Sequence, residues 1–352
     1  MKSQYLQIFV LLSVILLILS SCSTTKQTAS SIETEEQPAQ KTEEETSIPQ
    51  KIPPLPEEKE IIAPQPQTKA KDLEFDNPPV TFDPFNDPNG PFYHQVFVAH
   101  SDDGLNFEKK EGVVFDKASV PDIVKLPNGR IIVYAVDGAR RSKSGLMVAI
   151  SDDNGEAWQQ GSLQLKSPRQ FASGADPEAV FLPDGRIRLY YVVFPAPQQP
   201  GIIDTQSKNR VHSALSSDGI HFEEEEGFRF EYPQITDPDI AKIGDKWLMY
   251  LAQGPRLIAA LSSDGLIFKY EKIIREQGSV SNTINVGENL WRQFFCAFGE
   301  IRSATTSDGV NWNNDGGNRL KPDSNTIICD PAPVQVDSKW LLFYKVGHLP
   351  RL

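Results

Sequence analysis

SDDNGEAW (residues 151–158) combines a serine, two aspartates, an asparagine, a glycine and a tryptophan within one short stretch. Asp, Asn and Gly tolerate the tight and partly left-handed backbone of a hairpin turn, and Ser and Asp side chains bond nearby backbone amides. The tryptophan that ends the stretch can pack over the bend. We therefore interpret these residues as the braced turn of a β-hairpin.

The same turn recurs along the chain. Four further copies have Ser or Thr, then Asp-Gly, then an aromatic residue: SDDGLNF (101–107), SSDGIHF (216–222), SSDGLIF (262–268) and TSDGVNW (306–312). Spacings of 50, 65, 46 and 44 residues separate the corresponding aspartates, Asp103, Asp153, Asp218, Asp264 and Asp308. Each copy follows a short strand-like run. A repeat of this period indicates an array of similar supersecondary units.

A second repeated unit lies between these turns. It has a short apolar strand, a turn with Gly, Asp or Asn, and a longer strand rich in β-branched and aromatic residues. Its copies begin VPDIV (120), DPEAV (176), DPDIA (237), VSNTI (280) and DPAPV (330). Each module thus supplies four strands, two from this unit and two that flank the Asp-Gly turn. Four-stranded modules of about 45 to 50 residues are typical of β-propeller blades.

The two ends of the chain hold complementary halves of one module. HQVFVAHSDDGLNFEKKEGVVF (94–115) supplies the second half, and DPAPVQVDSKWLLFYKV (330–346) supplies the first half. Joining them completes five blades and leaves no free sheet edge. We predict an all-β fold, a five-bladed β-propeller over residues 81–352 whose last blade is closed by N-terminal and C-terminal strands.

Residues 1–21 have the pattern of an export signal, with Lys2, an apolar run from Ile8 to Leu19 and then small residues. The run is too short for a spanning helix. It ends in Leu-Ser-Ser-Cys (19–22), which resembles the lipobox of bacterial lipoproteins. The resemblance implies cleavage before Cys22 and a lipid anchor on Cys22, the alternative being an ordinary signal peptide. We expect an exported protein anchored at the bacterial cell envelope, on the outer membrane if the source has two membranes.

Residues 22–80 are rich in Pro, Glu and Thr and poor in aromatic residues. Such a composition buries too little apolar surface to offset its ordering entropy, so we expect a disordered tether. The formal net charge of the chain is −12. This acidic balance argues against nucleic acid and anionic lipid as partners.

Apart from Cys22, the chain contains only Cys296 and Cys329. In an exported protein these two can form a disulfide, but two separate buried thiols in neighbouring strands fit the pattern as well. No motif with metal-ligand spacing is present. We therefore expect no cofactor, while an all-oxygen site for a cation such as calcium stays open.

SDDNGEAW resembles the Asp-box of sialidases and other propellers, where it is a hairpin staple away from the active site. Five modules whose inner strands start in Asp-Pro resemble the five-bladed arabinanase and β-xylosidase superfamily of glycoside hydrolases. This resemblance implies acidic residues on the inner strands of the first three blades that project into a central funnel. Glycoside hydrolysis needs one carboxyl to protonate the leaving oxygen and another to act as base or nucleophile.

Aligning the five inner strands gives two columns of residues. The first column contains Val120, Asp176, Asp237, Val280 and Asp330. The second column, two residues further on, contains Asp122, Glu178, Asp239, Asn282 and Ala332. Residues i and i+2 of a strand face the same side, so the candidates for catalytic acids are Asp122, Asp176, Glu178, Asp237 and Asp239. The structural alternative is that some of them bond backbone amides between blades or cap strand starts.

The chain departs from the enzymes that it resembles. Val120 stands where they carry a first-blade aspartate, and Asp237-Pro238 stands where they usually carry Glu-Gly-Pro. FNDPNGPFYHQ (85–95) resembles the nucleophile motif of the invertase family, but it precedes the first blade strands. We interpret it as a turn-rich linker end.

Two functions follow from these patterns. The first is an envelope-anchored, glycoside-hydrolase-like propeller that acts on or recognises oligosaccharide, with Asp330 and the aromatic residues Phe171, Phe194 and Tyr232 as candidates for substrate binding. The second is a non-catalytic propeller lipoprotein that binds a glycan or a protein. We expect a carbohydrate partner, membrane attachment through Cys22, no nucleic acid and a monomer. The sequence does not identify a protein partner.

Overall fold

The computed structural model describes residues 68–75, 77–169, 173–195 and 207–348. The predicted signal peptide, Cys22, most of the predicted tether and Phe171 lie outside these residues. The described part is nearly all β, with two short 3₁₀ helices, η1 (Ala70–Asp72) and η2 (Pro91–Tyr93). No helix in it has the length and apolar character needed to span a membrane.

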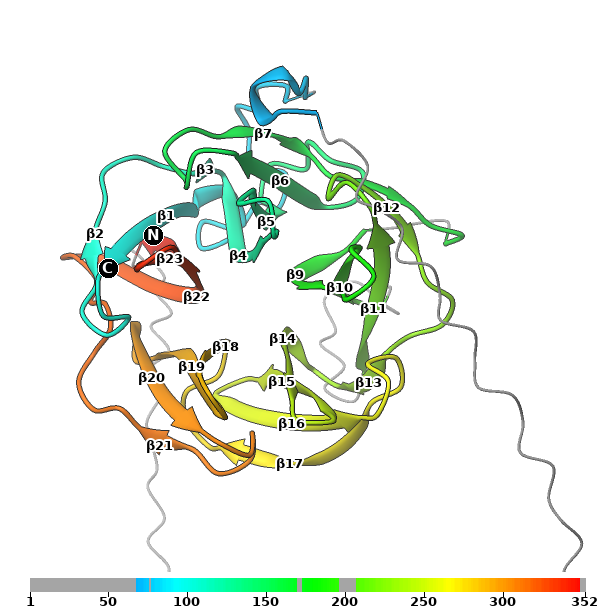
Figure 1. The fold of residues 1–352 in the computed structure, drawn as a ribbon. Helices are drawn as coiled ribbons and strands as arrows, with labels where there is room; N and C mark the ends of the chain where they lie inside the picture. The colour runs from blue at the N-terminus through cyan, green and yellow to red at the C-terminus, as the bar shows by residue number, and fades with distance from the viewer. Residues whose placement is uncertain (1–67, 76, 170–172, 196–206, 349–352) are drawn as a thin grey trace, which may run out of the picture. The chain divides into compact units, whose positions relative to one another are not determined.

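The strands form five sheets around a central axis, one sheet to each blade (Figure 1). Blade 1 contains β4 (Ala118–Lys125), β5 (Ile131–Asp137), β6 (Leu146–Ser151) and β7 (Gln159–Ser162). Blade 2 contains β9 (Ala175–Phe181), β10 (Ile187–Val193), β11 (Lys208–Ser216) and β12 (His221–Glu224), joined by β8 (Gln164–Lys166) and β13 (Phe230–Pro233). Blade 3 contains β14 (Thr236–Ile243), β15 (Lys246–Gln253), β16 (Arg256–Ser262) and β17 (Lys269–Arg275). Blade 4 contains β18 (Ser281–Gly287), β19 (Leu290–Ala297), β20 (Glu300–Thr306) and β21 (Asn313–Asn314).

Blade 5 is built from both ends of the described chain. It contains β22 (Thr326–Val336), β23 (Lys339–His348), β1 (Gln95–Ser101) and β2 (Glu108–Lys109), with β3 (Phe115–Asp116) beside β1. Strands β1 and β23 pair without interruption from Gln95 opposite Val346 to Ser101 opposite Trp340. The predicted five-bladed propeller with a shared last blade is therefore confirmed (Figure 1).

The direction of the strands places the Asp-Gly turns away from the first column. The first column lies toward the start of each inner strand. The next three strands of the blade alternate in direction because neighbouring strands are antiparallel. The turn between the third and fourth strands consequently falls at the other end of the blade. We call these two ends of the propeller the first-column end and the turn end.

A repeated set of hydrogen bonds braces the Asp-Gly turns. In blade 3, the Ser262 hydroxyl lies 2.8 Å from Asp264 Oδ1, and that oxygen accepts the amides of Leu266 and Ile267 at 2.8 and 3.1 Å. The same Ser or Thr contact recurs at the other four turns. Bonds from backbone amides hold the pKa of the Asp264 carboxyl below its usual value. Asp264 therefore stays ionised and stabilises the turn by accepting these hydrogen bonds.

Each of three turns is also held by a buried tyrosine of the preceding blade. In each case the tyrosine hydroxyl donates to the carbonyl of the turn glycine. The pairs are Tyr134 with Gly219 at 3.0 Å, Tyr190 with Gly265 at 2.8 Å and Tyr250 with Gly309 at 2.7 Å. Gly309 has φ +75°, and an added Cβ would lie 3.0 Å from the Tyr250 hydroxyl. A side chain there would thus be strained and would also break the contact between blades.

A disulfide joins blade 4 to blade 5. Cys296 of β19 and Cys329 of β22 are bonded, with their Cα atoms 5.1 Å apart. The sequence left this pairing open. Cys329 directly precedes Asp330, so the covalent link lies beside a first-column residue.

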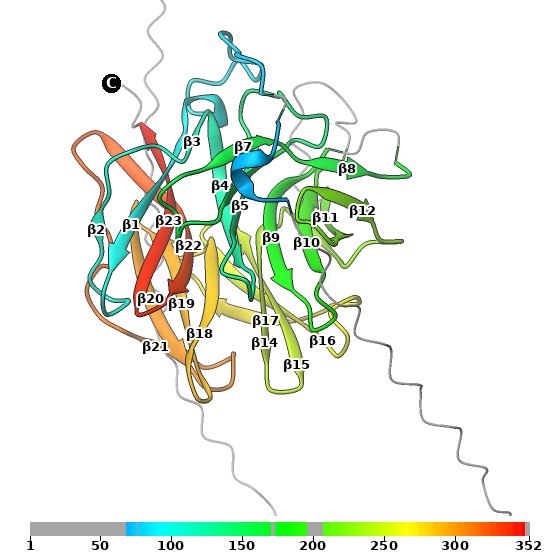
Figure 2. The same cartoon turned by 45° about the horizontal axis from the view of Figure 1, so that its top comes forward.

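The segment of residues 68–75 packs beside β7 on the outside of blade 1 (Figure 2). Leu73 and Phe75 contact the core shared by blades 1 and 2, and Ala70 is buried there. These contacts place residues 68–75, which fall within the predicted tether, against blades 1 and 2.

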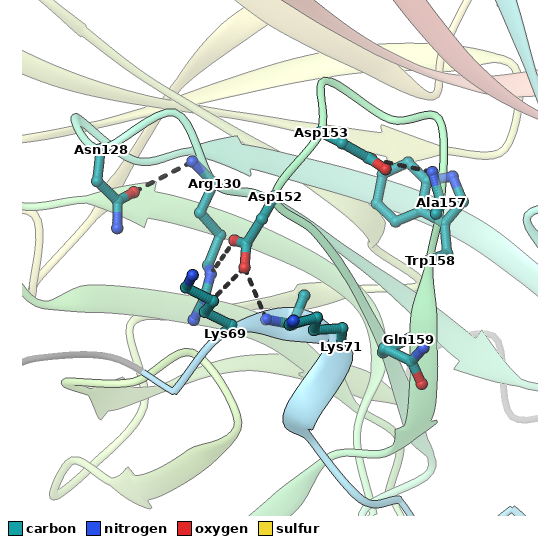
Figure 3. A pocket seen from close by; sticks show the side chains of 10 residues that line it. Lys69, Lys71, Asn128, Arg130, Asp152, Asp153, Ala157, Trp158 and Gln159 are labelled. Atoms are coloured by element: carbon teal, nitrogen blue, oxygen red, sulfur yellow. Dashed lines mark hydrogen bonds and ion pairs between the residues drawn. The ribbon is translucent and has the colours of Figure 1, made fainter.

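An ion pair of blade 1 holds this segment (Figure 3). Arg130 donates to Asp152 from Nε at 2.7 Å and from Nη2 at 3.0 Å, and its Nη2 also donates to the carbonyl of Thr68 at 2.6 Å. Asp152 Oδ2 in turn accepts the amide of Ala70 at 2.6 Å. A pocket of about 590 Å³ adjoins the contact, and its lining includes Lys71.

Replacing Arg130 should release the segment. We expect Arg130→Met to lower the free energy of unfolding by about 1–2 kcal/mol, because the Thr68 carbonyl loses its donor and Asp152, which accepts the Ala70 amide, loses the guanidinium that holds it in place, while Asp152 can regain water. Urea denaturation measures the loss, and limited proteolysis should show earlier cleavage near residues 68–75.

Lys71→Met is the matched control, because it removes a positive charge from the same pocket but from an exposed side chain. Equal stability of the Arg130 variant, the Lys71 variant and the wild type would contradict the assigned role of Arg130.

Candidate active site

The five inner strands share one backbone irregularity at the first column. Left-handed φ values of 49–53° occur at Val120, Asp176, Asp237, Val280 and Asp330. Four of these positions coincide with a register shift between the inner strand and its neighbour. Aspartate tolerates this conformation, whereas for the β-branched valines it is strained. Because a bulge interrupts the alternation of side chains, the two columns have different surroundings.

The second-column acids connect neighbouring blades. Each carboxylate accepts a backbone amide from the inner strand of the next blade: Ala179 to Asp122 at 2.6 Å, Ile240 to Glu178 at 3.0 Å, and Thr283 to Asp239 at 2.9 Å. These contacts match the structural alternative for the candidate acids, in which they bond backbone amides between blades. They join β4 to β9, β9 to β14, and β14 to β18.

Asp122 and Glu178 meet below the first column. The Asn282 amide donates to Asp122 Oδ1 at 2.7 Å and to Glu178 Oε2 at 3.2 Å. Asp122 is 2% exposed and Glu178 is 6% exposed. Burial raises the pKa of Asp122 to about 7, and burial together with the Asp122 charge raises the pKa of Glu178 well above its usual value. This pair therefore retains a proton at neutral pH.

Asp239 is fully satisfied by its own surroundings. Its carboxylate accepts bonds from the side chains of Ser281, Thr283 and Gln293 at 2.7–2.9 Å. The Asp239 side chain has no exposed surface. It is thus committed to the packing of blades 3 and 4, and we assign it no part in chemistry.

The first column brings three carboxyls together from blades 2, 3 and 5. The backbone amide of Asp237 donates to Asp176 Oδ2 at 3.4 Å. Burial and then the Asp237 charge raise the pKa of Asp176 well above its usual value. Burial and then the Asp330 charge raise the pKa of Asp237 to about 6. Asp176 and Asp330 are buried, while Asp237 is half-buried and reaches solvent.

Lys345 of β23 supplies a positive charge to this group. Its Nζ lies 2.7 Å from Asp330 Oδ2, and both side chains are largely buried. Burial works against the charge on Lys345, but Asp330, Asp237 and Asp176 raise its pKa. The lysine therefore remains charged and partly balances the three carboxyls.

His94 lies on the other side of Lys345. Its Nδ1 is 3.0 Å from the Ser119 hydroxyl, and its ring lies against Gly347, where an added Cβ would be 3.2 Å from Nε2. Burial and then the Lys345 charge lower the pKa of His94 to about 4. The histidine is therefore neutral at physiological pH. The segment 85–95, predicted to be a linker end, thus continues into the first-column end of blade 5.

Sequence reasoning missed Lys345 and His94. A lysine within the apolar run WLLFYKV was the available signal for Lys345, because an unpaired charge is rarely buried in a strand. His94 gave no such signal, since it precedes its strand and contacts Ser119 only through the fold.

The aromatic candidates for substrate binding differ in their exposure. Phe194 follows β10 and is 52% exposed. Tyr232 stacks against Phe230 and Tyr270, with ring centroids 5.9 and 5.3 Å away, so the faces of its ring are already engaged. Tyr232 therefore offers no free face to a sugar. Within the residues that the structure describes, no group of three or more His, Cys, Asp or Glu is placed to hold a metal ion.

No protein-family description and no curated protein sequence matches the chain. A thermostable family-43 glycoside hydrolase matches with a TM-score of 0.51 and 13% identity, over 66% of this chain and 88% of that one. The family 43 protein BlXynB from Bacillus licheniformis matches with a TM-score of 0.51 and 12% identity, over 66% of this chain and 49% of that one. Zg3597, a family 117 glycoside hydrolase from Zobellia galactanivorans, matches with a TM-score of 0.44 and 13% identity, over 73% of this chain and 91% of that one. The chain shares the five-bladed propeller fold of the family 43 enzymes, as its sequence resemblance predicted.

The buried carboxyls predict a specific pH dependence of stability. The folded-state pKa of Asp122 is raised, so the stabilisation from its proton is complete below the unfolded pKa and is lost as pH rises through about 7. Asp122→Asn cannot lose this proton. We expect the variant to gain up to about 1.4 kcal/mol per pH unit on the wild type between pH 5 and 7, then to level off.

Urea unfolding from pH 5 to pH 8 measures this difference. Asp245→Asn, in the exposed turn after β14, is the control and should keep a constant offset from the wild type. Parallel curves for wild type and Asp122→Asn would show that Asp122 does not carry the raised pKa.

Proposed function

We propose that this protein acts on an oligosaccharide at the first-column end, as a glycoside-hydrolase-like propeller. The supporting observation is that Asp176 and Asp237 occupy adjacent inner strands, with both pKa values raised. Glycosidic bond cleavage needs two neighbouring carboxyls that differ in protonation, one neutral to donate a proton and one ionised to act as base or nucleophile. The shared fold with family 43 glycoside hydrolases agrees with this choice of substrate class.

Asp176 is the proton donor in this proposal. Its carboxyl is more deeply buried than that of Asp237, and the neighbouring Asp237 charge favours its neutral form. The neutral carboxyl transfers its proton to the glycosidic oxygen as the bond to the leaving sugar breaks. Asp237, with a pKa of about 6, is ionised at neutral pH and serves as base or nucleophile.

Asp330 and Lys345 set the charge around this pair. The ion pair keeps a carboxylate close to the site without leaving it unpaired. The Lys345 charge also lowers the pKa values of Asp176 and Asp237, against the larger effect of burial. Asp330 is therefore proposed as a structural partner of the reacting carboxyls.

The cellular setting belongs to the same proposal. A signal peptide over residues 1–21, lipid on Cys22 and a tether up to the docked segment would place the propeller at the bacterial envelope. There it would meet carbohydrate as a monomer, held to the membrane by its lipid, on the outer membrane if the source has two membranes. The acidic net charge argues against nucleic acid at this site.

One observation favours recognition of a glycan without cleavage. Asp122, Glu178 and Asp239 are engaged between blades, and blade 1 offers only Val120 in the first column. Catalysis then depends on Asp176 and Asp237 alone. The binding function is the second candidate, and it predicts affinity without turnover.

Single substitutions separate these possibilities. On a panel of aryl glycosides and oligosaccharides, we expect Asp176→Asn and Asp237→Asn each to lower kcat/KM by about 10²- to 10⁴-fold, because each removes a group that moves a proton or attacks. The wild-type profile should rise as Asp237 ionises near pH 6 and fall at higher pH as Asp176 loses its proton.

Asp245→Asn is the control, since this exposed side chain lies in a turn at the turn end. Retained turnover in both first-column variants would exclude the proposed acids. Sugar binding by the wild type without turnover at any pH would select the non-catalytic alternative.

A further inference from the structure

Phe298 is displayed at the same end of the propeller as the first column. It forms the turn between β19 and β20 together with Gly299, because Ala297 pairs with Glu300. This turn joins the second and third strands of blade 4, so it lies at the first-column end. The Phe298 side chain is 77% exposed, more than the other large hydrophobic side chains of the described residues.

The turn that exposes Phe298 has an unfavourable backbone geometry. Phe298 has φ +56° and Gly299 has φ +75°. A two-residue hairpin turn with both φ values positive prefers Asn-Gly, and a bulky aromatic residue in the first position is strained. Since the ring is mostly in water, burial does not compensate. Neither turn geometry nor burial therefore gives a reason for a phenylalanine at this position.

The turn that carries the ring is nevertheless fixed to the strand of a first-column acid. Cys296, two residues before it, is bonded to Cys329, which adjoins Asp330. The amide of Ile328 donates to the carbonyl of Gly299 at 3.2 Å, which fixes the turn to β22. Two independent links thus join the Phe298 turn to the strand that carries Asp330.

An apolar strip continues from this turn across the edge of blade 5. A Cβ on Gly299 would lie 3.5 Å from the Ile327 side chain, and a Cβ on Gly347 would lie 3.4 Å from Ile327 and 3.2 Å from the His94 ring. The strip thus runs from Gly299, next to Phe298, through Ile327 to His94. Both glycines keep it flat, and it follows the strands β22 and β23 that carry Asp330 and Lys345.

Arg302 covers one face of the Phe298 ring, with its guanidinium carbon 5.7 Å from the ring centroid. Its side chain is 40% exposed and pairs loosely with Glu300 at 3.5 Å. The opposite face of the ring stays free. An aromatic face beside exposed polar side chains fits a sugar ring, because the C–H face stacks on the aromatic ring while the hydroxyls at its edge are hydrogen-bonded.

We propose that Phe298 is the stacking platform of a sugar subsite on the edge of blade 5, next to the first-column acids. The subsite takes one pyranose or furanose ring of the oligosaccharide. This inference rests on the proposed function, since it adds a binding position to that site. Phe298 contacts the sugar and takes no part in proton transfer.

Because the turn is unfavourable for phenylalanine, a substitution of Phe298 by asparagine should change sugar affinity and thermal stability in opposite directions. We expect Phe298→Asn to lower affinity for the best-bound oligosaccharide by about five- to twentyfold and to raise Tm by about 2 °C, because Asn-Gly suits this turn. Phe298→Tyr should keep the affinity within about twofold, since it preserves the ring. Calorimetric titration of the full chain with arabinose, xylose and galactose oligosaccharides measures binding, and thermal unfolding measures stability.

Ile267→Asn is the matched control, because Ile267 is 67% exposed but lies at the turn end. Unchanged affinity in Phe298→Asn, together with lost affinity or turnover in Asp176→Asn, would overturn the subsite and leave the proposed function standing. No binding of any sugar by the wild type would overturn both. Concentration-dependent dimers that disappear in Phe298→Asn, with sugar affinity unchanged, would assign the ring to a contact between copies and overturn the subsite.

Discussion

A left-handed residue in the first half of every blade's inner strand, or directly before it, determines how this propeller uses its acids. The conformation recurs in all five blades, even where valine occupies it at a cost in strain. The resulting bulge separates two sets of carboxyls that lie only two residues apart in sequence. Second-column acids bond the next blade, and first-column acids gather beside Lys345. One backbone constraint thus divides structural acids from candidates for chemistry.

Ring closure completes the site as well as the fold. Lys345 lies on β23, beside Asp330 of β22. His94 directly precedes β1, and the pairing of β1 with β23 brings it close to Lys345. The disulfide between Cys296 and Cys329 ties this shared blade to blade 4. The pairing of β1 with β23 and the disulfide thus fix the two strands that carry Lys345 and Asp330.

The sequence predicted the blades and their order because repeated turns and strand patterns are local signals. It also located the Asp-Gly turns away from the candidate acids. It did not predict that Asp122 and Asp176 have different surroundings, because the rule that residues i and i+2 face the same side fails at a bulge. No glycine marks the bulge in the sequence. The contacts of Glu178 with Ile240 and of Asp122 with Asn282 join distant parts of the chain. Residues 68–75 have the composition of a tether because their apolar side chains are few. In the structure three of these side chains pack against blades 1 and 2, and Arg130 and Asp152 bond the backbone of the segment.

The most direct test of this division is a crystal structure of the Asp176→Asn variant with a bound oligosaccharide from the panel. The account predicts a sugar ring within hydrogen-bonding distance of Asp237 and Asn at position 176, with Asp122, Glu178 and Asp239 still bonded between blades. A sugar bound elsewhere, or one that contacts the second-column acids in place of those bonds, would contradict it.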